Sequence, residues 1–449
     1  MKKFGKVFTF FVFILIGYYL FTLLSPKEPL KVWVLAPVAE DVDINTNIIM
    51  EFNDAPDLSS LEENFSVRPE ISGHFVAEGK KLQFIPDKPL EYQTHYLVTV
   101  NEGVRSKNDL VLDKPFTFAF ITQKRPPLQI MAVGDVMLDQ LTRQRLREYD
   151  HTYPFAKVKE VLRQGDVVFA NLEAPISGLG RPLPGKKYTF CAAPFSVQSL
   201  VDGGINMVSL ANNHIMDYGE EALAETIKIL AAQNIAFAGA GLNKNSAHAA
   251  AILKVKGYRV ALLAYTDDFA VPVQYRSFWQ SAEHKPGAAL LHDKNLIRDD
   301  IERAAAEADI VLVSFHWGNE YSYQVTAQQK ELARLAVDAG ADLVLGHHPH
   351  VPQAIEIYKG VPIVYSLSNF VFYPFPSYPQ TQDSFILQAE FQGETVTALK
   401  VIPVRGGDSQ PYLPQGQELH ILITQLTRLL DELGTTYKLT DKNIIKINL

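Results

Sequence analysis

The sequence predicts a small all-β domain followed by a larger α/β domain, both behind an apolar amino-terminal segment. Three observations predict this arrangement: an uncharged run at residues 7–24, short alternating strand-like segments between residues 31 and 122, and apolar strands alternating with helical patterns after residue 128. A chain of 449 residues is too long for one compact domain, and 47% hydrophobic residues supply enough apolar side chains for a sizeable core.

Charge and cysteine content narrow the function. Lys and Arg total 42 against 50 Asp and Glu, so the formal net charge is −8, and no basic run stands out. We therefore expect no nucleic-acid partner. Cys191 is the single cysteine, which excludes an intrachain disulfide framework and a cysteine-rich zinc site.

The amino terminus, residues 1–25, is predicted to be a membrane anchor. Its 18-residue uncharged run would span about 27 Å as a helix, close to the hydrocarbon thickness of a bilayer. Lys2, Lys3 and Lys6 precede the run, which predicts a cytoplasmic amino terminus and a single-pass cell-membrane protein whose carboxyl-terminal body is extracytoplasmic. A cleaved signal peptide and a buried helix are the alternatives, although no small-residue cleavage site follows the run.

Residues 31–122 are predicted to form an antiparallel β-sandwich. Short alternating segments such as 48–52 and 96–100 are separated by Asn, Asp, Gly and Pro. The layout resembles a bacterial Ig-like domain, on the segments Leu82-Gln83-Phe84-Ile85-Pro86 and Phe116-Thr117-Phe118-Ala119-Phe120. No cluster of residues with site-like spacing occurs here, so we expect a spacer or adhesion module. A linker is predicted at 124–127, where two prolines follow two basic residues.

The α/β domain is predicted over residues 128–430, with a carboxyl-terminal extension at 431–449. Helical patterns are clearest around residues 223–230 and 332–339. The predicted strands are 128–133, 167–170, 207–210, 260–264, 310–315, 343–345 and 363–366.

Polar side chains follow six of these strands, and they predict one site because ligands of α/β sheets lie at the carboxyl ends of strands. The candidate metal ligands are Asp135, Glu173, Asn213, His316, His348 and His350. Carboxylate, amide and imidazole ligands suit a divalent ion such as Mn, Fe or Zn, and two ions would need about six or seven such ligands. Each residue also has a plainer interpretation as a cap, a turn residue or a core histidine. His347 is expected to be a neighbour of the site, because adjacent side chains usually point apart.

Six segments in order make residues 128–430 resemble the CapA family of poly-γ-glutamate capsule biosynthesis proteins. They are Val133-Gly134-Asp135-Val136-Met137-Leu138, Asn171-Leu172-Glu173, Leu210-Ala211-Asn212-Asn213-His214 with Asp217-Tyr218-Gly219, His316-Trp317-Gly318-Asn319-Glu320-Tyr321, Gly346-His347-His348-Pro349-His350-Val351 and Ser366-Leu367-Ser368-Asn369-Phe370. The resemblance implies a metallophosphoesterase-like αββα sandwich and an envelope protein that assists polyglutamate synthesis or export.

By the same resemblance, Asp135 would hold one metal and Glu173 would bridge two. Asn213 would hold the second metal, His214 would be the catalytic general acid, and the three other histidines would complete the ligand shells. The sequence departs from the metallophosphoesterase pattern at Met137, where a histidine is usual. Ser368 replaces a usual glycine, and Tyr373 replaces a frequent acidic residue.

Three functions follow from this interpretation. The first is a capsule-assembly protein whose partners are the cell membrane, an anionic polymer such as poly-γ-glutamate, and other membrane subunits of a polymer synthase. The second is an envelope metallophosphoesterase, a metal-dependent hydrolase, and the third is a tether without catalysis. The Gly/Pro-rich loop 178–190, which carries Arg181, Lys186 and Lys187, is predicted to border the site as a flap. An ordinary solvated basic loop is the alternative.

Overall fold

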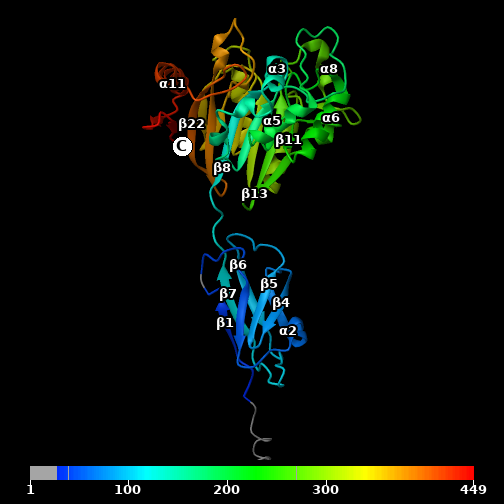
Figure 1. Cartoon of the computed structure of the whole chain (residues 1–449), viewed down its shortest axis with the longest axis vertical. Coiled ribbons are helices and arrows are strands. Elements are labelled where there is room, and N and C mark those ends of the chain that lie inside the picture. The colour runs from blue at the N-terminus through cyan, green and yellow to red at the C-terminus, as the bar shows by residue number, and fades with distance from the viewer. Residues whose placement is uncertain (1–27, 39, 269) are drawn as a thin grey trace, which may run out of the picture. The chain divides into compact units, whose positions relative to one another are not determined.

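The computed structural model describes residues 28–38, 40–268 and 270–449. Its chain divides into two compact units, one ending at Arg125 and the other beginning at Pro126 (Figure 1). The division falls within the proline-containing run 124–127, where the sequence predicts a linker. The predicted anchor at residues 1–25 lies outside the described residues. Within the described ranges, none of the helices has both the length and the apolar composition needed to span a bilayer.

Over its described residues, the first unit contains two antiparallel sheets and one short α-helix. One sheet has the order β1 (Val32–Ala36), β2 (Ile48–Phe52), β5 (Lys81–Pro86), β4 (Gly73–Glu78), and the other has the order β3 (Phe65–Arg68), β6 (His95–Val100), β7 (Phe116–Ile121). Alternate residues of β2 and β6 are buried, among them Met50 and Val98. Helix α2 (Leu58–Asn64) begins after Asp57, whose carboxylate accepts a hydrogen bond from the Ser60 amide. The unit is an Ig-like β-domain.

The second unit contains a nine-stranded mixed sheet. Its order is β11 (Ala236–Ala238), β10 (Met207–Ser209), β9 (Val167–Leu172), β8 (Leu128–Val136), β21 (Asp383–Gln392), β22 (Thr395–Arg405), β24 (Ile445–Ile447), β23 (Tyr437–Leu439), and β20 (Asn369–Val371) also pairs with β8. Strands β8 to β11 are parallel to one another. Their carboxyl ends therefore meet at one edge of the sheet.

A six-stranded sheet faces the first. Its order is β13 (Ala251–Val255), β14 (Tyr258–Thr266), β16 (Ile310–His316), β17 (Leu343–His347), β19 (Val361–Val364), β18 (Ile355–Tyr358), and β12 (Ala240–Gly241) pairs separately with β15 (Gly287–Ala288). Strands β14, β16, β17 and β19 are parallel. Apolar side chains of both sheets, such as Phe169 and Leu312, share one buried core, so the sheets pack face to face.

Helices cover the outer faces of both sheets. The described α-helices of this unit are α3 (Gln140–Glu148), α4 (Lys159–Leu162), α5 (Val197–Asp202), α6 (Gly219–Ala232), α7 (Lys244–Ala247), α8 (Arg276–Trp279), α9 (Lys294–Glu307), α10 (Ala327–Asp338) and α11 (Gly416–Asp431), of which α11 packs against the core between the sheets. Helices α5 and α6 pack on the nine-stranded sheet, and α9 and α10 pack on the six-stranded sheet. The second unit thus has four layers in the order α, β, β, α.

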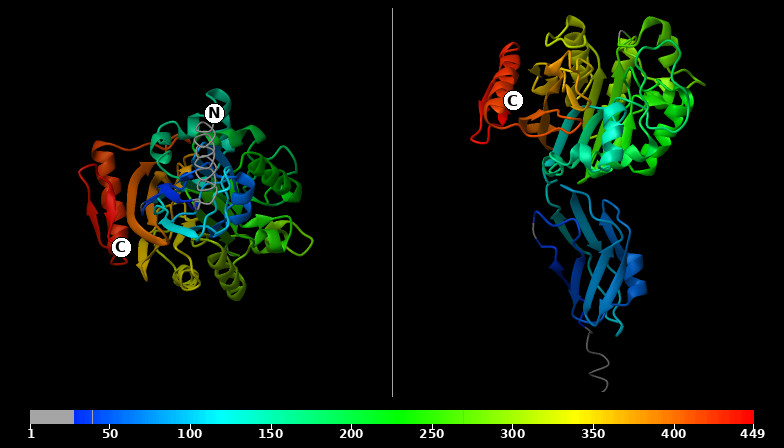
Figure 2. Two further views of the ribbon diagram at one scale, coloured as in Figure 1. Left: turned by 90° about the horizontal axis from the view of Figure 1, so that it is seen from below. Right: turned by 45° about the horizontal axis from the view of Figure 1, so that its top comes forward.

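The segment after residue 430 continues this unit. Although the sequence suggested an extension at 431–449, β24 pairs with β22 and β23 pairs with β24 in the nine-stranded sheet. Ile445 and Ile447 are buried in the core between the sheets, together with Leu426 of α11. Figure 2 shows α11 and these last strands, in red, along one side of the unit.

Candidate metal centre

All six predicted ligands lie together at the carboxyl ends of strands from the two sheets. Asp135 ends β8 beside Asn171 of β9 and Asn369 of β20, with which it is in register. His316 ends β16 beside His347 of β17 in the facing sheet. Parallel pairing within each sheet and packing of the two sheets therefore bring residues more than 200 positions apart in the sequence into one centre.

An inner group consists of Asp135, Glu173 and His316, whose nearest ligand atoms all lie within 4.8 Å of one another. All three side chains are buried. The Asn171 amide nitrogen lies 2.9 Å from Asp135 Oδ1, 3.5 Å from Glu173 Oε2 and 3.4 Å from His316 Nδ1. Asn213 Oδ1 lies 2.9 Å from His316 Nε2. Asn171 thus contacts every member of the inner group.

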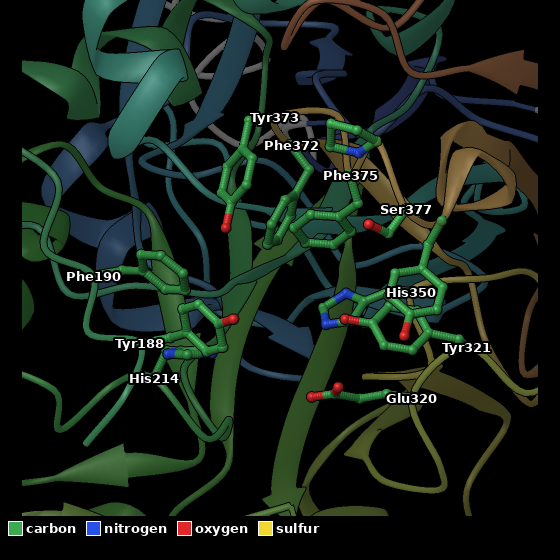
Figure 3. A pocket seen from close by; sticks show the side chains of 12 residues that line it. Tyr188, Phe190, His214, Glu320, Tyr321, His350, Phe372, Tyr373, Phe375 and Ser377 are labelled. Atoms are coloured by element: carbon green, nitrogen blue, oxygen red, sulfur yellow. The ribbon is translucent and has the colours of Figure 1, made fainter. Parts of the chain in front are cut away.

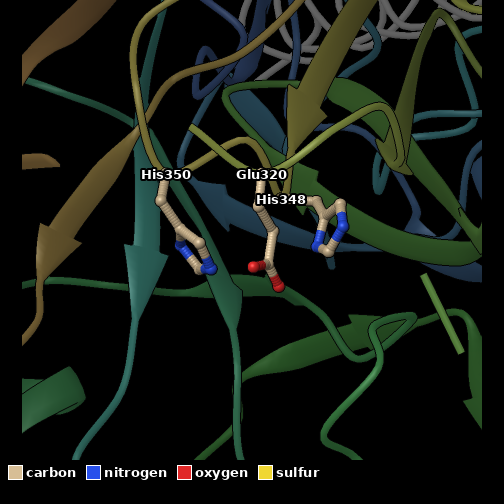
Figure 4. A group of neighbouring side chains, drawn as sticks. All are labelled: Glu320, His348 and His350. Atoms are coloured by element: carbon tan, nitrogen blue, oxygen red, sulfur yellow. The ribbon is translucent and has the colours of Figure 1, made fainter. Parts of the chain in front are cut away.

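An outer group consists of Glu320, His348 and His350, again with ligand atoms within 4.8 Å of one another (Figure 4). The two groups adjoin, because His350 Nε2 lies 4.0 Å from Glu173 Oε1 and the rings of His316 and His348 have centroids 4.7 Å apart. His350 Nδ1 lies 2.8 Å from Asn369 Oδ1, which orients the ring.

The predicted catalytic residue, His214, is part of a buried charge cluster beside this centre. Its Nδ1 lies 2.7 Å from Asp217 Oδ2. The Lys186 ammonium donates hydrogen bonds to Asp217 and, at 2.6 Å, to the Asn213 carbonyl oxygen. Burial lowers the pKa of His214, and the charge of Asp217 opposes that shift. Asp217 therefore fixes the orientation of the ring and leaves Nε2 for a substrate.

The backbone at the centre is unusually constrained. His348, His350 and Ser368 have φ angles of 94°, 57° and 66°, a region that non-glycine residues seldom adopt. A Cβ on Gly134 would lie 1.9 Å from the Ser368 carbonyl oxygen, so only glycine lets β8 approach this turn. Strained and closely packed backbone of this kind is typical of functional sites.

The electrostatics of the centre favour a bound cation. Burial alone would raise the pKa of Asp135, but the hydrogen bond from His347 and the charges of three nearby histidines lower it. Burial, and then the charge of Asp135, raise the pKa of Glu173 well above its ordinary value. Burial lowers the pKa of His316, and it lowers that of His348 to about 3, and a lowered pKa favours the neutral imidazole, which is the form that can bind a metal.

Several buried atoms of the centre have no hydrogen-bond partner among the described residues. They are Asp135 Oδ2, Glu173 Oε1, His347 Nε2 and His348 Nδ1. Buried polar atoms are nearly always satisfied, so four such atoms in one place call for a missing partner. Oxygen and imidazole nitrogen donors without cysteine fit a divalent ion such as Mn, Fe or Zn.

A pocket of about 320 Å³ opens onto the centre (Figure 3). Tyr188, Phe190 and His214 lie on one side, and Glu320, Tyr321 and His350 lie opposite. The remaining lining residues are Phe372, Tyr373, Phe375, Pro376, Ser377 and Tyr378. Aromatic side chains thus dominate the wall, and the lining of this pocket contains neither Lys nor Arg.

The loop 178–190 borders the site, as the sequence predicts. Tyr188 and Phe190 line the pocket, and Lys186 points inward to Asp217. Arg181 and Lys187 are exposed. Because the Lys186 ammonium is bound by Asp217, the loop does not present all three of its cations to a ligand.

The sequence interpretation missed several residues of the centre. His347 was expected to be a neighbour of the site, and its Nδ1 lies 3.0 Å from Asp135 Oδ1. The positive φ of His348 turns the next side chain into the site as well. Asn171, Asp217 and Glu320 lay in the quoted motifs without a role. Met137, where a ligand histidine is usual in the resembling fold, packs instead beside Phe190 and Phe372.

Comparison with known proteins defines the class. Residues 129–374 match the family described as "Bacterial capsule synthesis protein PGA_cap", and residues 26–122 match "Bacterial Ig-like domain". The capsule biosynthesis protein CapA of Bacillus anthracis is 31% identical over 330 residues, covering 72% of this chain and 78% of that protein. The PGA biosynthesis protein CapA of Bacillus subtilis (strain 168) is 33% identical over 281 residues, covering 62% of this chain and 72% of that protein.

These matches place the chain in the class of bacterial proteins that join an Ig-like domain to an α/β capsule-synthesis domain. The chain belongs to the PGA_cap family of bacterial capsule synthesis proteins. Among solved structures, L,D-transpeptidase 1 of Mycobacterium tuberculosis matches 24% of this chain and 44% of that chain at 17% identity and a TM-score of 0.16, too low to indicate a shared fold.

Proposed function

We propose that the protein is a membrane-anchored, outward-facing member of its family that supports the synthesis or export of poly-γ-glutamate through a metal centre of metallophosphoesterase type. The observation that carries the proposal is the convergence of the inner and outer groups, with their unpartnered buried atoms, beside a pocket. The relatives named for capsule and PGA biosynthesis support the polymer. The four-layer arrangement of the second unit supports the likeness to metallophosphoesterases.

Different side chains of the centre would have different roles. Asp135, Glu173, Asn213, His316, His348 and His350 would hold one or two divalent ions, which supply Lewis acidity to a phosphoryl or carboxyl group. His214 lines the pocket with its Nδ1 held by Asp217, and in its protonated form it would give a proton from Nε2 to a leaving oxygen. The aromatic wall of the pocket excludes water around the reacting group.

The anchor and the orientation are part of the same proposal. An uncharged run at residues 7–24 behind Lys2, Lys3 and Lys6 supports a single span with the body outside the cytoplasm. Other membrane subunits of a polymer synthase would then be partners. Membrane fractionation, with protease added to intact cells, tests this: we expect the body in the membrane fraction and accessible from outside. Recovery in the cytosol, protected from protease, would contradict the orientation.

One experiment tests the centre and its chemistry together. The full chain is stripped with chelator, reloaded with Mn, Fe or Zn, and assayed for bound metal and for hydrolysis of phosphodiesters and γ-glutamyl peptides. We expect bound metal in the wild-type protein and its loss in His316→Ala and His348→Ala. If both variants keep the metal and every activity, the assigned centre is wrong.

A second candidate function is an envelope phosphoesterase acting on a small phosphorylated substrate. It is favoured by the pocket, whose aromatic lining without Lys or Arg suits a compact ligand better than a long polyanion. Phosphodiester hydrolysis without an effect of deletion on capsular polymer would support it. Loss of polymer on deletion, with no hydrolysis under any metal, would instead support a tether without catalysis.

A further inference from the structure

Glu320 is the one exposed member of the six side chains that form the inner and outer groups. It follows β16, whereas His348 and His350 follow β17, so the outer group joins two loops. Figure 4 shows the Glu320 carboxylate between the two imidazole rings. An exposed carboxylate near histidines is common without a ligand, so its position needs independent support.

Backbone hydrogen bonds hold the two loops together. The amide of Trp317 donates to the His347 carbonyl oxygen at 3.1 Å, and the amide of Tyr321 donates to the Pro349 carbonyl oxygen at 2.8 Å. These bonds flank Glu320 on both sides. The Tyr321 ring also stacks on Tyr378, with centroids 3.9 Å apart and planes 4° apart. The backbone around Glu320 is therefore fixed relative to the loop that carries His348 and His350.

An unpartnered buried atom belongs to the same group. His348 is 5% exposed, and its Nδ1 makes no hydrogen bond among the described residues. Its positive φ holds the ring in the site at a cost in backbone strain. A buried histidine with an unpartnered nitrogen, grouped with a carboxylate and a second imidazole, supplies a donor set that a divalent ion would satisfy.

The charges around Glu320 also favour a bound cation. Glu320 adds a third carboxylate to those of Asp135 and Glu173 in the two adjoining groups. Lys186 is the nearby cation, and its ammonium is bound by Asp217. Three carboxylates without a dedicated cation of the protein favour a bound metal ion over an apo centre.

We propose that Glu320 is a metal ligand that, with His348 and His350, completes the outer cation position of this centre. The inference rests on the proposed metal centre and adds a ligand to it from the loop after β16. Glu320 would also close the pocket floor on the side opposite His214. A different role, in which Glu320 only repels anionic ligands at the pocket mouth, would leave metal binding unchanged on its removal.

Metal titration of the full chain separates these roles. Wild-type protein, Glu320→Gln and Glu320→Ala are stripped with chelator and titrated with Mn²⁺ by calorimetry, and bound metal is counted by elemental analysis. Glu302→Gln, an exposed acid on α9, is the control for the same change of charge. We expect both Glu320 variants to bind Mn²⁺ at one position at least tenfold more weakly, with the control unchanged and the metal-free melting temperatures equal.

The outcomes distinguish the two proposals. If wild-type protein and both Glu320 variants bind Mn²⁺ with the same affinity and stoichiometry, Glu320 is no ligand, while the metal centre stands. If wild-type protein binds no Mn²⁺, Fe²⁺ or Zn²⁺, the proposed centre fails and Glu320 with it. Manganese electron paramagnetic resonance provides an independent measurement, because loss of the outer Mn²⁺ ion would change the spectrum of the inner Mn²⁺ ion.

Discussion

His347 Nδ1 lies 3.0 Å from Asp135 Oδ1, and both side chains are completely buried. The pair joins the end of β17 in one sheet to the end of β8 in the other. An ionised carboxylate can only accept, so His347 donates from Nδ1. His347 is thus a positioning residue that fixes one oxygen of Asp135 and leaves Oδ2 for a cation.

Loss of this hydrogen bond is expected to weaken metal binding. In His347→Ala, Asp135 would lose the donor that orients it, and we expect a 10- to 100-fold lower affinity for Mn²⁺ in calorimetric titration. His284→Ala, which removes a fully solvated imidazole (90% exposed), is the control. Unchanged affinity in His347→Ala would show that Asp135 needs no such support.

Bound metal is expected to raise the free energy of unfolding more in the wild-type protein than in a variant that lacks one carboxylate of the inner group. At a free metal concentration 100 times Kd, binding adds about 2.7 kcal/mol to the free energy of unfolding. Glu173→Gln removes a buried carboxylate whose Oε1 is unpartnered, so its metal-free form should be at least as stable as the metal-free wild type. Thermal melting with metal and with chelator checks both expectations, and an equal metal response in the two proteins would refute them.

The charge cluster around Asp217 is expected to matter for stability. Asp217→Ala would leave the Lys186 ammonium and His214 in a buried site without their carboxylate, at a cost of about 3–5 kcal/mol in denaturant unfolding. Lys186→Met combined with Asp217→Ala removes both charges and should recover part of that loss. Equal stability of the single and double variants would mean that the buried lysine is not the cause.

Gly134 is expected to tolerate no side chain. In Gly134→Ala the new Cβ would meet the Ser368 carbonyl oxygen at 1.9 Å, and β8 or the turn before β20 would have to shift. We expect a loss of about 2–3 kcal/mol in unfolding free energy, together with weaker metal binding. Gly406→Ala, where the nearest atoms lie 3.6 Å away, is the matched control. Equal melting temperatures of the two variants would contradict the prediction.

Asp342 is expected to make stability depend on pH. Burial raises its pKa to about 6 from 3.8, although its carboxylate accepts a hydrogen bond from the Val311 amide at 2.8 Å. Because the folded pKa is the higher one, the stabilising contribution is complete below about pH 4 and is lost as the pH rises through about 6.

Replacement of Asp342 by asparagine is expected to remove this loss of stability at higher pH. Asp342→Asn should exceed the wild type in unfolding free energy at pH 7.5 by up to about 2–3 kcal/mol, and should match it at pH 4. Urea unfolding at the two pH values measures the difference. A constant difference between the proteins across this range would rule out titration of Asp342 as the cause.

Much of the fold and of the site could be predicted from sequence because both depend on local patterns. Apolar alternation marked the strands of the first unit, and polar residues after apolar strands marked the six candidate ligands that the structure brings together. The sequence patterns did not predict segments that are too short or too irregular to show a period. Strand β24 was missed because three residues, Ile445–Ile447, carry too little pattern by themselves.

The sequence by itself determined the kinds of ligand available, since in a chain with one cysteine the proposed metal centre has only oxygen and imidazole nitrogen donors to use. It also determined that these ligands follow strands. Only the tertiary structure decided which of them meet, because face-to-face packing of two sheets places Asp135 and His316 in one buried group. It alone decided that Glu320 and His347 join them, since loop hydrogen bonds and turns between distant strands set those positions.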